Sequence, residues 1–239
     1  MSGAPDSLRL LSYNIHGCIG RDGVENAERV LELIRRVDAD VVALQEVYDL
    51  DDADRNFLRG LDALGYTSVI YGQTMQKTVG PYGIILMSRR TPSEFERIDL
   101  SLPGAEPRGA IRAVIPFAGE SVSICATHLG LRAEERQAQL TKLAQSCPQA
   151  MGDSGTGPGI LMGDLNEWWP LSVNLFTIRK RFHRTSEWPT FPVWFPVFAL
   201  DRICVQGFQG KIHFHRPSSD LARVASDHRP IVADLCCNK

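Results

Sequence analysis

The sequence predicts an α/β fold in which two β-sheets pack face to face and helices cover the outside. Short apolar runs typical of strands recur along the whole chain, whereas only two segments carry the apolar spacing of an amphipathic helix. No linker-like or low-complexity stretch divides the 239 residues, so we predict a single domain spanning 1–239. The composition, 44% hydrophobic and 23% charged, suits a sizeable buried core.

The elements are predicted in chain order. A strand over 8–15 precedes a helix over 24–38, and a second helix follows over 133–147, both with apolar residues at helical spacing. Glycines indicate a loop at 152–159. The other strands are short apolar runs, the pattern of strands covered on both faces: 40–47, 82–88, 110–117, 121–129, 159–164, 199–205 and 229–235.

Net charge and cysteine content limit the class to which the protein can belong. The net charge of −2 excludes an overall basic surface for nucleic acid, although a local basic groove fits within a neutral total. The six cysteines show no paired metal spacing and indicate reduced residues of a cytosolic protein. No signal-peptide pattern and no membrane-length apolar stretch occur. We therefore expect a cytoplasmic monomer within reach of the inner face of the membrane.

Polar side chains stand at the ends of the predicted strands. Strand ends are where an α/β scaffold carries its catalytic groups, so we expect these side chains to converge on one site. They are Asn14, Glu46, His128, Asp164, Asn166, Asp201, Asp227 and His228.

The residue types in this set predict a chemistry. Carboxylate and amide oxygens are ligands for magnesium, calcium or manganese rather than zinc. Histidines can transfer a proton or stabilise charge that develops on a phosphate. Together they indicate metal-assisted hydrolysis of a phosphoester. His213 and His215 share a strand face and could also chelate a metal, but no third ligand lies nearby in the sequence.

Six short motifs occur in one order along the chain: SYNIHG, LQEV, THLG, GDLN, LDRI and SDHRP. Their order resembles that of the endonuclease/exonuclease/phosphatase superfamily, which is deoxyribonuclease I-like, and the resemblance runs from about residue 8 to 235. It implies a four-layer α/β sandwich of two mixed β-sheets, with the site at one end of the sandwich. It also implies Mg²⁺ as cofactor, with Mn²⁺ as the alternative.

The resemblance implies roles around the metal. Glu46 is expected to be the principal metal ligand, with Asn14 and Asp227 beside the metal. Asp164 is expected to orient or deprotonate the attacking water, and Asn166 to hold the phosphate.

The resemblance also implies roles around the phosphate. His228 would contact the scissile phosphate, Asp201 would orient its imidazole, and His128 resembles a second histidine of the deoxyribonuclease and sphingomyelinase branches. Arg108 matches a basic residue near the phosphate. One departure is Ile84, which stands where many relatives carry an asparagine.

The segment 168–200 is the informative one for substrate. This segment is either a proline-stiffened loop that only packs over the sandwich, or a loop that lines the substrate site. Cations would contact phosphate, and aromatic rings would contact a lipid surface or bases. The candidate substrate-binding residues are Arg179, Lys180, Arg181, Arg184, Trp188 and Trp194.

The sequence thus favours a magnesium-dependent phosphodiesterase. The segment resembles a bacterial branch found beside cardiolipin-synthesis genes, which favours a phospholipid-related substrate and an anionic phospholipid surface as partner. The alternatives are a DNA or RNA nuclease, with nucleic acid as partner, and a small-molecule or inositide phosphatase. An inactive binding relative is disfavoured because every catalytic position is filled.

Overall fold

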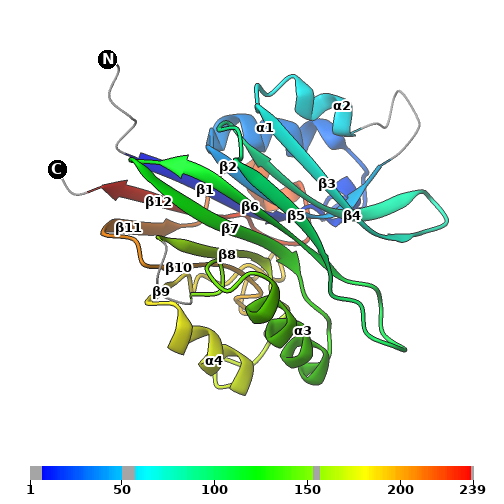
Figure 1. The fold of residues 1–239 in the computed structure, drawn as a ribbon. Coiled ribbons are helices and arrows are strands. Elements are labelled where there is room, and N and C mark those ends of the chain that lie inside the picture. Colours follow the sequence, from blue (N-terminus) through cyan, green and yellow to red (C-terminus); the bar gives the residue numbers. More distant parts are fainter. Residues whose placement is uncertain (1–6, 50–56, 153–156, 238–239) are drawn as a thin grey trace, which may run out of the picture.

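The computed structural model describes residues 7–49, 57–152 and 157–237, and in these ranges it has the expected sandwich of two six-stranded sheets with helices outside (Figure 1). The first sheet has the order β11 (Gly210–His215), β12 (Ile231–Cys237), β1 (Ser7–Asn14), β2 (Val41–Tyr48), β4 (Pro81–Ser88) and β3 (Ser68–Gln76). The second has the order β5 (Glu94–Asp99), β6 (Gly109–Phe117), β7 (Glu120–His128), β8 (Gly159–Asp164), β10 (Asp201–Gln206) and β9 (Arg184–Thr185).

Both sheets are mixed. The pairs β1–β2 and β7–β8 are parallel, and the other paired strands are antiparallel. The first sheet is covered by α1 (Ala27–Val37), α2 (Phe57–Asp62) and α5 (Asp220–Val224), and the second by α3 (Ala133–Ser146) and α4 (Val173–Arg181). No helix of the described ranges is both long and apolar enough to cross a membrane.

Alternation of side chains explains why the central strands are continuous apolar runs. Along β1, Leu8 and Leu10 enter the core between the two sheets, whereas Leu11 and Tyr13 pack under the helices. Successive side chains of a strand point to opposite faces, so a strand covered on both faces needs apolar residues at consecutive positions. The same packing buries α1, which starts after Asn26, whose side chain accepts a hydrogen bond from the backbone of Arg29.

Several elements differ from the expectation. The sequence indicates no strand at β5, because most of its residues are exposed and charged, and none at β3, which pairs with β4 at the other sheet edge. The segment 168–200 is not a loop throughout, since it contains α4 and β9. Residues 153–156 of the expected glycine-rich loop lie outside the described residues.

Gly163 allows β7 and β8 to lie close together. It pairs with Thr127 in the parallel register and has a φ of +145°, which L side chains rarely adopt. A Cβ at this position would lie 1.9 Å from the Thr127 carbonyl oxygen. The glycine of GDLN therefore sets the spacing of the two strands that end at His128 and Asp164.

We predict that Gly163→Ala lowers the free energy of unfolding by about 3 kcal/mol or more, because one of the two backbones must move. Gly104→Ala is the matched control: its φ is +75° but nothing lies within 4 Å of the added Cβ. That control should lower the free energy of unfolding by only about 1–2 kcal/mol, because a non-glycine residue is less stable in the left-handed region. Urea denaturation measures both, and equal losses would contradict the close approach at Gly163.

Candidate active site

Strand register places three of the predicted residues in a row. His128, at the end of β7, lies opposite Asp164, at the end of the neighbouring parallel strand β8. Asp164 lies opposite Asp201, the first residue of the antiparallel strand β10. The ends of three adjacent strands therefore bring together residues that are far apart in the sequence.

Asn14 connects this row to the other sheet. Its side-chain amide donates to Oδ2 of Asp164 at 3.0 Å and to Oε1 of Glu46 at 2.9 Å. Glu46 reaches this position from a bulge in β2, where the pairing with β4 shifts register and the φ of Glu46 is +60°. A non-glycine residue in the left-handed region costs free energy and often marks a functional site.

His228 is held in one orientation by Asp201. The distance from Nδ1 to Oδ2 of Asp201 is 2.8 Å, and Nε2 lies 3.9 Å from Oδ2 of Asp164. The ring of Phe191 packs against the imidazole, with 4.8 Å between ring centroids. Burial by itself lowers the pKa of His228, but the carboxylates of Asp201, Asp164 and Asp227 outweigh burial and raise the pKa to about 10. His228 is therefore an imidazolium at neutral pH that donates to Asp201 through Nδ1.

His128 is neutral, unlike His228. Burial, and then the nearby positive charges of Arg108, His228 and Lys77, hold its pKa well below the ordinary value. Nη1 of Arg108 lies 3.2 Å from Nδ1 of His128. A guanidinium can only donate, so Nδ1 accepts and Nε2 carries the hydrogen of the neutral ring. Nε2 lies 3.6 Å from Oδ2 of Asp164.

Asp164 has a raised pKa between these two histidines. Burial is the largest cause and the charge of Asp201 adds to it, while His228 and Asn14 act in the opposite direction, so that the pKa is about 6. A carboxylate with such a pKa is ionised at neutral pH and accepts a proton more readily than an ordinary aspartate.

Asn166 and its neighbour Glu167 fix the loop after β8. The backbone N–H of Asn166 donates to Oδ1 of Asp164 at 2.9 Å, and its side-chain amide donates to the carbonyl of Leu129 at 2.9 Å. Glu167 forms a buried two-point pair with Arg136 of α3, at 3.1 and 3.0 Å. Sequence reasoning did not find this pair, because nothing in the spacing of the two residues connects them.

Arg136 also holds the loop after β7. Its guanidinium donates to the carbonyl oxygens of Gly130, at 3.3 Å, and Leu131, at 2.6 Å. One buried arginine thus connects both loops that follow the catalytic strand ends. Lys77 is a second residue that the sequence did not indicate: its Nζ lies 3.6 Å from the centroid of the Tyr82 ring, and its charge reaches His128.

The oxygen ligands of the site fit magnesium. Glu46 and Asp227 are partly exposed carboxylates that both connect to Asn14: Glu46 accepts from its side-chain amide, and Ser226, which also bonds Asp227, donates to the Asn14 carbonyl oxygen at 2.8 Å. Magnesium needs only one or two carboxylates besides water and substrate. The amide oxygen of Asn14 accepts from the backbone N–H of His16, so its role as a direct ligand stays a prediction.

Potential metal-ligating side chains also form groups of three. Within the described ranges, two groups have ligand atoms within 4.8 Å of one another: Asp164 with Asp201 and His228, and a separate group on β11 and β12. The first group coincides with the row of strand ends and could bind a metal. Glu46 and Asp227 belong to neither group.

The basic residues of 168–200 are not brought to the catalytic residues. Arg179 pairs with Glu187 at 2.6 Å and donates to the carbonyl of Pro170. Arg184 lies opposite Val205, four residues along β10 from Asp201, roughly 13 Å at strand spacing. Lys180 and Arg181 complete the last turn of α4, and the Arg181 backbone packs on Gly152 in the connection that leads into β8.

The two candidate tryptophans differ in position. Trp188 donates to the carbonyl of Phe214 at 3.1 Å and packs against β11. Trp194 is 64% exposed and follows Val193, whose N–H donates to the Asp227 carbonyl at 2.7 Å. Arg108 is buried beside His128. The contact with phosphate that the resemblance implies for Arg108 stays a prediction.

Comparison with known proteins identifies the family and the fold. Residues 11–228 match the Endonuclease/Exonuclease/phosphatase family. The "Uncharacterized protein YbhP" of Escherichia coli K12 is 31% identical over 248 residues, covering 96% of each chain. An endonuclease/exonuclease/phosphatase from Beutenbergia cavernae has a TM-score of 0.76 at 22% identity over 98% of this chain and 72% of that one. The human Nocturnin catalytic domain with bound sulfate has a TM-score of 0.72 at 22% identity, covering 97% and 95%.

We predict that His228 stabilises the metal-free protein in a pH-dependent way. Its folded pKa of about 10 lies above the ordinary 6.5, so its contribution is complete below pH 6.5 and is lost as the pH rises through 10. Asp201→Asn should therefore cost most free energy of unfolding near pH 6 and least near pH 10. Urea denaturation in chelator across this range measures the difference. An NMR titration in which the His228 ring deprotonates near 6.5 would contradict the prediction.

Proposed function

The chain belongs to the endonuclease/exonuclease/phosphatase family, and from that premise we propose that it is a magnesium-dependent phosphoesterase that hydrolyses a phosphodiester. Members of this family are generally hydrolases of phosphoesters. The observation that carries the proposal is the convergence on Asp164: Nε2 of His128 and Nε2 of His228 lie 3.6 and 3.9 Å from its Oδ2, and the side-chain amide of Asn14 donates to the same oxygen.

Each side chain of the site has its own role in the proposed hydrolysis. Asp164 takes the proton of the attacking water, whose oxygen forms the new bond to phosphorus as the bond to the leaving oxygen breaks. His228 offers its Nε2–H to the charge that builds up on the phosphate, and Asp201 keeps the ring aligned through Nδ1. His128 adds a neutral N–H donor at Nε2, fixed by Arg108.

Glu46 and Asp227 would hold the magnesium ion. When bound, the ion neutralises phosphate charge and lowers the pKa of a coordinated water. Asn14 keeps Glu46 at a fixed distance from Asp164, because one amide donates to both carboxylates.

A set of exposed apolar side chains favours a phospholipid as the source of the phosphodiester. We call this set the apolar rim; its members are between 51% and 94% exposed. They are Leu131, Trp169, Leu171, Trp194, Phe195 and Val197.

The apolar rim is joined to the site by its backbone. Leu131 lies on the loop whose Leu129 accepts from Asn166, and Trp169 follows three residues after Asn166. Trp194 follows Val193, which bonds to the carbonyl of Asp227. Three loops that leave the catalytic residues therefore carry apolar side chains into solvent, an arrangement that suits a site placed against a lipid surface.

We predict that hydrolysis of bis-p-nitrophenyl phosphate is lost in chelator and restored by magnesium. His228→Ala and Asp164→Asn should each lower turnover on the order of 10²–10⁴-fold, the range for an acid–base or charge-stabilising group. Glu46→Gln should mainly raise the magnesium concentration needed for half-maximal activity. Arg184→Gln, remote from the site, is the control and should keep wild-type kinetics. Full activity in excess chelator would rule out the metal assignment.

We predict that vesicles containing anionic phospholipid retain the protein through the apolar rim. Each rim side chain that enters the lipid boundary contributes about 1.5 kcal/mol, or roughly tenfold in partitioning. Leu171→Ser combined with Trp194→Ser should therefore weaken retention about a hundredfold. Phe95→Ser, which removes a 52% exposed ring on β5, should leave retention unchanged. Vesicle co-sedimentation measures all three proteins.

A nuclease would give the opposite pattern. The same aromatic side chains can stack on bases, and binding to DNA or RNA would fall steeply with salt. Absence of vesicle retention together with salt-sensitive binding to plasmid DNA would replace the lipid assignment by a nucleic acid. A substrate panel of phosphatidylglycerol, sphingomyelin, DNA and RNA with magnesium identifies the phosphodiester.

A further inference from the structure

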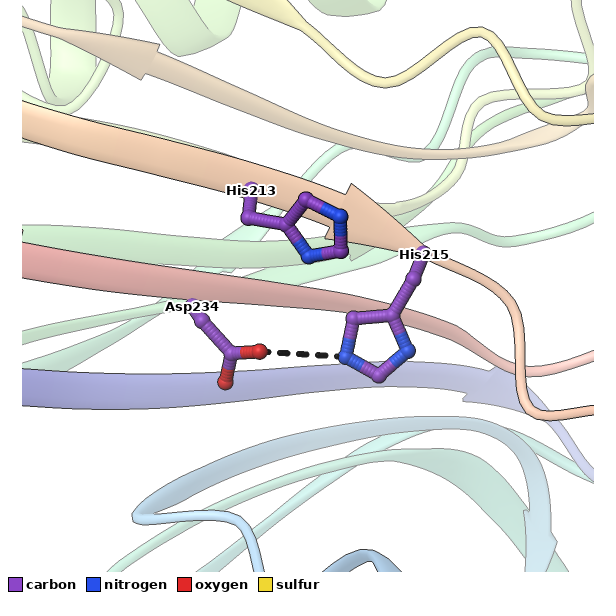
Figure 2. Close-up of side chains that lie close together, drawn as sticks. All are labelled: His213, His215 and Asp234. Atoms are coloured by element: carbon purple, nitrogen blue, oxygen red, sulfur yellow. Dashed lines mark hydrogen bonds and ion pairs between the residues drawn. The ribbon is translucent and has the colours of Figure 1, made fainter.

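Three metal-ligating side chains meet on the outer face of the first sheet, away from the row of strand ends (Figure 2). His213 and His215 are two residues apart on β11, so both point to the same face, and their rings stack with 5.4 Å between centroids. Asp234 of β12 lies directly opposite His213 in the antiparallel register. The third ligand that the sequence lacked near the two histidines comes from the neighbouring strand.

The distances suit one small ion. One ligand atom from each residue lies within 4.8 Å of the other two, and Nε2 of His215 is already 3.1 Å from Oδ2 of Asp234. Ligand atoms of a tetrahedral zinc ion are about 3.3 Å apart, given bonds of about 2.0–2.1 Å. Binding would therefore draw the ligand atom of His213 toward the other two. In the described part of the chain, the His213 ring has no hydrogen-bond partner to lose.

Arg9 orients the carboxylate. Its Nε donates to Oδ1 of Asp234 at 2.6 Å, which leaves Oδ2 directed at His215. Partners of this kind fix ligand orientation in metal sites. The Asp234 side chain is 22% exposed and that of His215 is 37% exposed, so an ion and its water can enter from solvent.

We propose that His213, His215 and Asp234 form a second divalent metal site, selective for zinc and separate from the magnesium site. Two imidazoles and one carboxylate are ligands for borderline ions such as Zn²⁺, whereas magnesium prefers oxygen. A water molecule completes the coordination.

The position of the site gives it a structural consequence. β11 is the edge strand of its sheet, and an ion at this site would cross-link it to β12 in addition to the strand ladder. His215 ends β11, and the chain then runs through α5 to Asp227 and His228 before β12 begins. Zinc would therefore cross-link the two strands between which the segment that carries Asp227 and His228 runs.

Calorimetric titration with Zn²⁺ tests the proposal. The titrated protein carries Glu46→Gln and His228→Ala, so that neither the magnesium carboxylate nor the group of Asp164, Asp201 and His228 competes for zinc. We expect one zinc site that disappears, or weakens at least tenfold, in His213→Ala and again in His215→Ala. His183→Ala is the matched control, because His183 is an exposed histidine that contacts Gln206 of β10, in the second sheet. Zinc binding that is unchanged by the first two variants overturns the proposal.

Two further readouts separate the site from general zinc binding. Co²⁺ in place of zinc should give the intense visible absorption of a four-coordinate ion, and this band should vanish in His213→Ala. Zinc should raise the melting temperature of the parent but not of His213→Ala, because ligand binding stabilises only a protein that contains the site. A chain that binds no zinc, or a zinc-induced stabilisation equal in both proteins, also overturns the proposal. Loss of magnesium-dependent hydrolysis, in contrast, bears only on the proposed function.

Discussion

The side-chain amide of Asn14 is the interaction on which the site depends. It is buried and donates to one carboxylate in each sheet, Glu46 and Asp164, across the interface of the sandwich. A buried amide or carboxylate without a partner costs about 1–3 kcal/mol, so the sheets are held at the spacing and register in which both bonds form. A shift of β1 by one residue would turn Asn14 to the opposite face and remove the link.

The electrostatics of the site follow from this packing. Two histidines a few ångströms from the same carboxylate differ in charge: burial and the Arg108 guanidinium keep His128 neutral, whereas the Asp201 carboxylate outweighs burial and keeps His228 protonated. Burial by itself lowers the pKa of both imidazoles, and it also strengthens the neighbouring charges, because these act through protein and not through water. A charged and a neutral N–H donor are thereby held ready on either side of Asp164, with no conformational change required.

The loops around the site are joined by a buried ion pair and carry exposed apolar side chains. Arg136 and Glu167 form a buried pair that joins the loops after β7 and β8, and removal of one partner from such a pair commonly costs about 3–5 kcal/mol. The apolar rim extends outward from these same loops and from the segment beside Asp227. The buried hydrogen bonds of the candidate site are thus separate from the exposed apolar side chains of its loops.

The sequence by itself determined the buried strands, α1, α3 and the strand-end residues, because burial on both faces demands consecutive apolar residues and each polar exception is visible against them. Only the tertiary structure decided which side chains meet. Asp234 faces His213 through antiparallel register, and Arg136 reaches Glu167 from a helix. Such partners are close in space and distant along the chain, and neither local periodicity nor composition records the register that joins them.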